Sequence, residues 1–197
     1  MQIIGVSGRD RSGKDTVADI LIAYGYFGYS FGDAVRRHSL ERHKGELDPI
    51  SVKNMTETSN WLRTQHGPDV ILQEALVEYE KAKAAGKQYK GIVLYSVRAP
   101  IEADFILAHG GKLIWVESSD QVRYERKIAN MRDGEALVTI EEMLAQESLQ
   151  TKPQTGLPQE VQMDLNYIKS HANMVIENNG SDRAVFEQTV KASLKLV

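Results

Sequence analysis

The chain has 197 residues, of which 42% are hydrophobic and 26% are charged. These values are ordinary for one globular domain, and no run approaches the roughly 18 apolar residues of a membrane-spanning helix. The net charge of −3 argues against a broad nucleic-acid surface, and the absence of cysteine excludes disulfides, cysteine-ligated zinc and a thiol nucleophile. No signal-peptide pattern precedes the first predicted strand. We therefore expect a single cytoplasmic domain over residues 1–197, with neither membrane nor nucleic acid as partner.

Apolar runs and helical periodicities alternate along the chain. Strands are expected at residues 2–7, 26–31, 92–95, 112–116 and 174–176. Helices are expected at 14–24 and 33–44, in a long stretch up to about 86 that breaks at Gly67-Pro68, after Pro100, at 140–149, and from about Ser181. This alternation predicts an α/β fold in three layers, a five-stranded parallel sheet covered by helices on both faces. Ligands then bind beyond the carboxyl ends of the strands.

The turn after the first strand carries a phosphate-binding signature. Residues 8–16 read Gly-Arg-Asp-Arg-Ser-Gly-Lys-Asp-Thr, which contains the Gly-x₄-Gly-Lys pattern of a P-loop, or Walker A motif. Its glycines let backbone N–H groups approach an anion, and the following helix turns the positive end of its dipole toward that anion. We predict a nucleoside triphosphate site made by Gly8, Arg11, Ser12, Gly13, Lys14, Asp15 and Thr16.

Lys14 and Thr16 have the most specific predicted roles in this loop. Lys14 is expected to reach the β- and γ-phosphates and to act in catalysis. Thr16 is the predicted Mg²⁺ ligand, although the hydroxyl usually comes directly after the lysine and Asp15 stands there instead. The alternative is a glycine-rich turn with a surface lysine. A dinucleotide site is disfavoured because the loop has no Gly-x-Gly-x-x-Gly pattern.

Two further strand ends carry an arginine. Gly32-Asp33 follows the second strand, with Arg36 one helical turn later, and Arg98 follows the third strand. A guanidinium group binds phosphate bidentately, so Asp33, Arg36 and Arg98 are predicted to bind a second phosphate-bearing molecule. The alternatives are that Asp33 only caps the next helix and that Arg98 only pairs with Glu102.

The stretch from about residue 130 to 160 contains glycines and prolines around a short helix, which is typical of a mobile lid; the alternative is an ordinary surface excursion. Arg123, Arg126 and Arg132 lie just before it or within it. We predict that these three arginines close over the transferring phosphoryl group, the alternative being solvated helix residues. The helical region at about 33–90 is expected to form the acceptor site.

These motifs resemble the nucleoside monophosphate kinases of the adenylate kinase group, in which the hydroxyl is also displaced by one position. The Gly-Lys-Asp-Thr sequence at 13–16 is similar to phage-type deoxynucleoside monophosphate kinases. This resemblance implies a P-loop kinase fold with a small helical lid, in which Arg36 and Arg98 hold the acceptor's phosphate and Asp33 shapes its pocket. Arg126, Arg132 and the segment 175–180 resemble dephospho-coenzyme A kinases, which implies that Asn178 lies near the adenine of ATP.

The resemblance implies transfer of the γ-phosphoryl of ATP to a nucleoside or deoxynucleoside monophosphate, with ATP and Mg²⁺ bound. Two alternatives stay open: dephospho-coenzyme A as the acceptor, and a regulatory ATPase that is not a kinase. One departure concerns the metal, because Tyr95-Ser96 stands where many nucleoside monophosphate kinases have an aspartate. Mg²⁺ is then held by Thr16, the phosphates and water, or by Asp15 or Asp33, or the activity is low.

Overall fold

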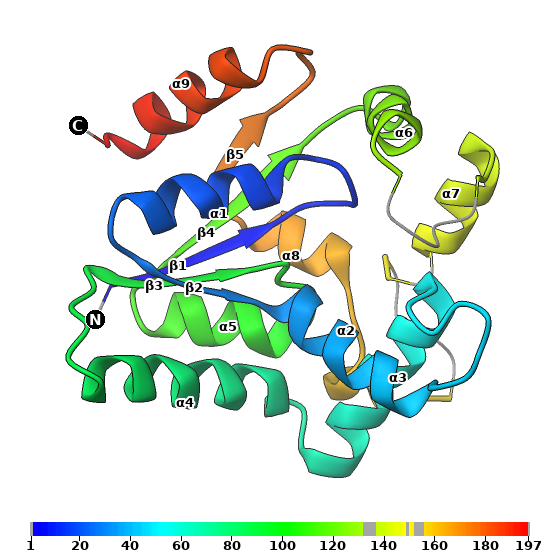
Figure 1. Ribbon diagram of the computed structural model, residues 1–197. Helices are drawn as coiled ribbons and strands as arrows, with labels where there is room; N and C mark the ends of the chain where they lie inside the picture. Colours follow the sequence, from blue (N-terminus) through cyan, green and yellow to red (C-terminus); the bar gives the residue numbers. More distant parts are fainter. Residues whose placement is uncertain (1, 132–136, 149, 152–155, 197) are drawn as a thin grey trace.

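The computed structural model describes residues 2–131, 137–148, 150–151 and 156–196, and Figure 1 shows their arrangement. The strands are β1 (Gln2–Ser7), β2 (Phe27–Ser30), β3 (Gly91–Tyr95), β4 (Lys112–Glu117) and β5 (Met174–Glu177). They pair in the order β2-β3-β1-β4-β5, and every pairing is parallel. The predicted five-stranded parallel sheet is therefore confirmed.

The helices are α1 (Lys14–Ala23), α2 (Phe31–Arg42), α3 (Val52–His66), α4 (Val70–Ala84), α5 (Pro100–Ala108), α6 (Asp120–Ala129), α7 (Ile140–Ser148), α8 (Leu165–His171) and α9 (Arg183–Leu194), with a 3₁₀ turn at Gln159–Val161. Helices α6 and α8 were not predicted. The buried positions of α6 are Arg123 and Lys127, so it lacks an apolar stripe, and α8 has only seven residues. In the described ranges, each helix falls short of the length and apolarity that a bilayer span requires.

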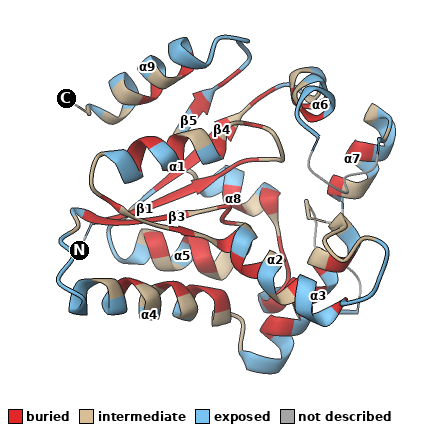
Figure 2. Cartoon of the chain, in the orientation of Figure 1, coloured by how far each residue is buried: buried red, intermediate tan, exposed pale blue. Residues whose placement is uncertain are grey.

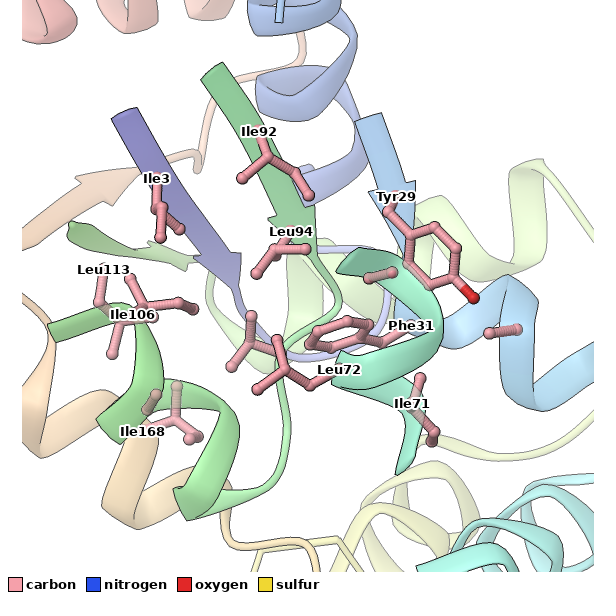
Figure 3. Packing of buried hydrophobic residues seen from close by; sticks show 14 of the residues in the cluster. Ile3, Tyr29, Phe31, Ile71, Leu72, Ile92, Leu94, Ile106, Leu113 and Ile168 are labelled. Carbon is pink, nitrogen blue, oxygen red and sulfur yellow. The ribbon is translucent and has the colours of Figure 1, made fainter. Parts of the chain in front are cut away.

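The two faces of the sheet bury separate hydrophobic cores, because successive side chains of a strand point to opposite sides. Ile4 faces α1 and α9, whereas its neighbour Ile3 faces α4, α5 and α8. Figure 2 shows the buried strands between these two helical layers. In Figure 3, Leu94 of β3 lies among Ile106 of α5 and Leu72 of α4. Each such aliphatic side chain contributes roughly 1.5–3 kcal/mol on full burial.

The topology brings three loops to one edge of the sheet. β3 pairs with both β1 and β2, so Tyr95 is in register with Val6 and with Ser30. The hydroxyl of Ser7 donates a hydrogen bond of 2.5 Å to the carbonyl of Val97, which joins the end of β1, just before the P-loop, to the loop after β3. The chain termini lie at the opposite end of the sheet (Figure 1). The strand-end residues predicted to bind phosphate therefore share one side of the molecule.

Candidate active site

The P-loop connects β1 to α1 through two glycines that no other residue replaces without strain. Gly13 caps α1 with a φ of 100°, in the left-handed region, and a Cβ there would lie 2.3 Å from Nδ2 of Asn178. A Cβ on Gly8 would lie 2.5 Å from Oγ of Ser12. Within the described structure no side chain caps the N-terminus of α1, whereas Ser30 caps α2. The first turn of α1 therefore keeps backbone donors for an anion.

Residues from the ends of β4 and β5 hold the carbonyl groups of this loop. The carbonyl of Ser12 accepts from Nδ2 of Asn178 at 2.8 Å and from the hydroxyl of Ser118 at 3.2 Å. Arg126 donates to the carbonyl of Arg11 at 3.2 Å, to Asn178 at 3.0 and 3.1 Å, and to the carbonyl of Gly180 at 2.8 Å. These contacts bind the carbonyl groups of the loop and fix its shape.

A cavity of about 360 Å³ opens between the P-loop, α2, the start of α3, α6 and α7. Five of the predicted site residues line it: Lys14, Asp15, Asp33, Arg36 and Arg98. The remaining described ones lie outside its lining: Gly8, Arg11, Ser12, Gly13, Thr16, Arg123, Arg126 and Asn178. Arg132 falls outside the described residues, as does part of the predicted lid.

The acceptor-side residues behave differently from both alternatives considered for them. Ser30, not Asp33, caps α2, since its hydroxyl accepts from the backbone N–H of Asp33 at 3.1 Å, and the Asp33 carboxylate forms an ion pair with Arg36. The guanidinium of Arg98 donates to the side-chain oxygen of Gln150, while only its backbone N–H binds Glu102, at 2.9 Å. Asp33 therefore does not cap α2, and the contact of Arg98 with Glu102 is made by its backbone and not by its guanidinium.

The environment of Arg98 suits an anionic ligand. Burial lowers the pKa of its guanidinium, and the negative charges of Asp10 and Glu147 partly offset that effect. Desolvation destabilises the charged form of a group, and a bound anion restores it. A phosphate in the cavity would thus be stabilised by Arg98 more strongly than a phosphate at an exposed arginine.

Arg123 was expected at the transferring phosphoryl group, and the structure places it elsewhere. It is fully buried and donates to both carboxylate oxygens of Glu147, at 2.5 and 2.9 Å, to Asp120 at 2.7 Å, and to the carbonyl of Asp10 at 3.1 Å. Burial opposes the charge, but the hydrogen bonds of Glu147 and Asp120 outweigh it and raise the pKa of Arg123. Arg123 therefore joins α6 to α7, just as Arg126 and Asn178 support the loop.

Lys127 and Ser96 are among the residues of the cavity wall that sequence reasoning did not single out as site residues. Lys127 lines it from α6, one helical turn after Arg123. Ser96 lines it from the end of β3 with a φ of 61°, which is unusual for a residue other than glycine and is often found at functional sites. The four-residue spacing of Arg123 and Lys127 was the available signal for an inward polar face of α6. The strain at Ser96 has no signature in the sequence.

These features define a protein of the three-layer α/β P-loop class, with the kinase-like fold that the sequence predicts. No family model matches the sequence. The UPF0200 protein PAE1629 of Pyrobaculum aerophilum is 30% identical over 139 residues, which cover 70% of this chain and 71% of that protein. The UPF0200 protein MMP1282 of Methanococcus maripaludis is 26% identical over 137 residues, or 69% of this chain and 71% of that protein. The chain belongs to the UPF0200 family.

Solved structures are similar over nearly the whole chain. The crystal structure of TT1252 from Thermus thermophilus has a TM-score of 0.54 at 25% identity, covering 100% of this chain and 98% of that one. A shikimate kinase from Bacteroides thetaiotaomicron has a TM-score of 0.49 at 13% identity, covering 99% and 97% of the two chains. A dephospho-CoA kinase from Campylobacter jejuni has a TM-score of 0.48 at 16% identity, covering 98% and 96%.

Proposed function

We propose that this protein is an ATP-dependent phosphotransferase that moves the γ-phosphoryl of ATP to a nucleoside or deoxynucleoside monophosphate. The observation that carries the proposal is that cations from separate elements line one cavity. Lys14 comes from the P-loop, whereas Arg36 comes from α2 and Arg98 from the loop after β3. A triphosphate held at Lys14 and a monophosphate held at the two arginines would share this space, as phosphoryl transfer requires.

The donor half of the proposal rests on the P-loop. The uncapped first turn of α1 and the Lys14 ammonium would bind the β- and γ-phosphates of ATP. In the described residues no group of three or more His, Cys, Asp or Glu side chains forms a metal site. Thr16, in the first turn of α1, and Asp15, on the cavity wall, are the hard oxygen donors that Mg²⁺ prefers. These two side chains fit a Mg²⁺ ion that would be bound mainly by the nucleotide phosphates. The ion would neutralise part of the negative charge of those phosphates.

The acceptor half rests on the part of the cavity wall formed by α2, α3, α7 and the loop after β3. Arg36 and Arg98 would bind the acceptor's phosphate, and the apolar side chains of Ile50, Met55 and Met143 would contact its base. A volume of about 360 Å³ lies at the lower end of the roughly 300–1,000 Å³ range of small-ligand sites, so it suits one small acceptor whose phosphate meets the end of a triphosphate held at Lys14. Helix α7, which lies in the described part of the predicted lid, would exclude water from the site.

An acceptor panel tests the proposal. The release of ADP from ATP is measured with Mg²⁺ and each ribo- and deoxyribonucleoside monophosphate, with dephospho-coenzyme A, and with no acceptor. Stimulation by a monophosphate, lost in Lys14→Ala, is the expected result. Slow hydrolysis that no acceptor stimulates would instead identify a regulatory ATPase, and stimulation by dephospho-coenzyme A alone would replace the proposed acceptor. Activity unchanged in Lys14→Ala would overturn the proposal outright.

A further inference from the structure

Helix α6 turns two cations inward. Arg123 and Lys127 are four residues apart, so they lie on the same face of the helix, and both are buried. Their surroundings differ. The guanidinium of Arg123 is bound by Glu147, Asp120 and the carbonyl of Asp10, whereas Lys127 lines the cavity. The third cation considered, Arg126, binds the backbone of the P-loop and of residues 178–180. Among these three α6 side chains, Lys127 is the one on the cavity wall.

We propose that Lys127 is a catalytic residue whose ammonium binds the transferring phosphoryl group, the role that the sequence suggested for Arg123 and Arg126. This inference rests on the proposed function and adds a residue to it. Lys14, Arg36 and Arg98 bound the same cavity from the P-loop, α2 and the loop after β3, so Lys127 supplies a cation from a further direction, α6.

The burial of Lys127 makes its charge effective. The residue is 6% exposed, comparable to the 3% of the P-loop lysine Lys14. A charge that faces a cavity from a buried position interacts with a ligand at a lower effective dielectric constant than a surface charge does. Lys127 also lies one helical turn from Arg123, which fixes its position. Because Arg123 joins α6 to α7 and to the P-loop carbonyl of Asp10, it holds the helix that carries Lys127.

In the transfer, an oxygen of the acceptor's phosphate forms a bond to the γ-phosphorus while the bond from that phosphorus to the β–γ bridging oxygen breaks. The electron pair of the broken bond leaves with ADP, and no proton needs to move when the acceptor's phosphate is a dianion. Negative charge then spreads over the three equatorial oxygens of the moving group. The Lys127 ammonium would donate to the equatorial oxygens on the α6 side of the cavity without changing its own protonation state.

The test compares Lys127→Met with the wild type and with Lys127→Arg, using the acceptor found in the panel. We expect kcat to fall roughly 100-fold in Lys127→Met, the cost of removing one preorganised donor, and Lys127→Arg to recover part of it. Calorimetry should give an unchanged Kd for ADP, but weaker binding of ADP with aluminium fluoride, a mimic of the moving phosphoryl group. Lys81→Met, which removes an exposed lysine from α4, is the matched control and should behave as wild type.

Two results would overturn the inference and leave the proposed function standing: a wild-type kcat in Lys127→Met, or equal weakening of ADP with and without aluminium fluoride. The second result would indicate a merely structural role. An inactive wild type across the whole acceptor panel would reject the proposed function, and the role of Lys127 with it.

Discussion

Arg63 of α3 and Glu102 of α5 form a buried ion pair, 2.6 Å from Nη2 to Oε1, with exposed fractions of 2% and 1%. The other carboxylate oxygen of Glu102 accepts from the backbone N–H groups of Arg98, at 2.9 Å, and Ala99, at 3.0 Å. One carboxylate therefore fixes the loop that carries Arg98 and ties it to α3. Because α3 begins at the cavity, the pair couples the two walls of the predicted acceptor site.

Removal of this carboxylate charge should destabilise the fold. Glu102→Gln leaves the Arg63 guanidinium buried without its counter-ion, and breaking such a pair from one side costs about 3–5 kcal/mol. We expect a loss of that order in the free energy of unfolding, measured by denaturant titration. Glu78→Gln, which breaks an exposed ion pair with Lys81, is the control and should change it by less than about 1 kcal/mol. Equal effects of the two changes would contradict the structural role of the buried pair.

Gly13→Ala should lower the free energy of unfolding more than Gly45→Ala, a replacement at which only the backbone angle opposes the new side chain. Gly13 and Gly45 have φ values of 100° and 96°, but a Cβ on Gly13 would lie 2.3 Å from Asn178, whereas nothing lies within 4 Å of one on Gly45. Gly45→Ala thus measures the left-handed strain alone, about 1–2 kcal/mol. We expect Gly13→Ala to lose more unfolding free energy and also to weaken ATP binding in calorimetry. In the double variant Gly13→Ala/Asn178→Ala, the shorter side chain at position 178 should relieve part of the clash. Its loss of unfolding free energy should therefore be smaller than the sum of the two single losses, and a loss equal to that sum would argue against the clash.

Arg98→Ala should weaken use of the acceptor more than use of ATP. Loss of a charge-assisted phosphate contact of about 2–3 kcal/mol corresponds to a fall of roughly 30- to 150-fold in kcat/KM for the acceptor. Steady-state kinetics with either substrate varied would measure this, and the KM for ATP should stay nearly constant. Arg42→Ala is the control, because that arginine lies over the ring of Trp61 at 4.4 Å and does not line the cavity. A larger effect on ATP than on the acceptor would reassign Arg98 to the donor side.

The cluster that joins α2 to α4 should make stability depend on pH. Burial opposes ionisation of Glu74, but hydrogen bonds with Tyr29 and His38 and the charge of Arg37 outweigh it, so the pKa of Glu74 is lowered from 4.5. A lowered pKa in the folded state stabilises the fold above about pH 4.5, and this contribution disappears as the pH falls through the folded value.

The comparison of Glu74→Gln with the wild type isolates this contribution. We expect the variant to be less stable by about 1–2 kcal/mol near pH 7, with the difference shrinking below pH 4.5 as the wild-type carboxylate takes up its proton. Denaturant unfolding at a series of pH values measures it. Glu80→Gln, at an exposed position paired with Lys83, should show little difference at any pH. A difference that persists unchanged at low pH would contradict the charge-based explanation.

The sheet and the P-loop could be predicted from the amino-acid sequence, because both depend on local signals. Apolar runs alternate with helical periodicities, and Gly8, Gly13 and Lys14 stand between a strand and a helix. The sequence also predicted that Arg36 and Arg98 lie near each other, since the ends of parallel strands meet at one edge. Both arginines do line one cavity.

The contacts of each cationic side chain depend on long-range packing and could not be predicted. Arg123, Arg126 and Lys127 lie within five residues of one helix and look alike in the sequence. In the structure, Arg123 binds Glu147, Arg126 binds a carbonyl of the P-loop, and Lys127 lines the cavity. The partners come from segments far away in the chain, and a helix without an apolar stripe offers only the four-residue spacing of Arg123 and Lys127 as a signal for its buried face, which does not tell what each side chain contacts. The local sequence therefore defines the phosphate-binding loop, while long-range packing distinguishes the side chains that support it from those that face a ligand.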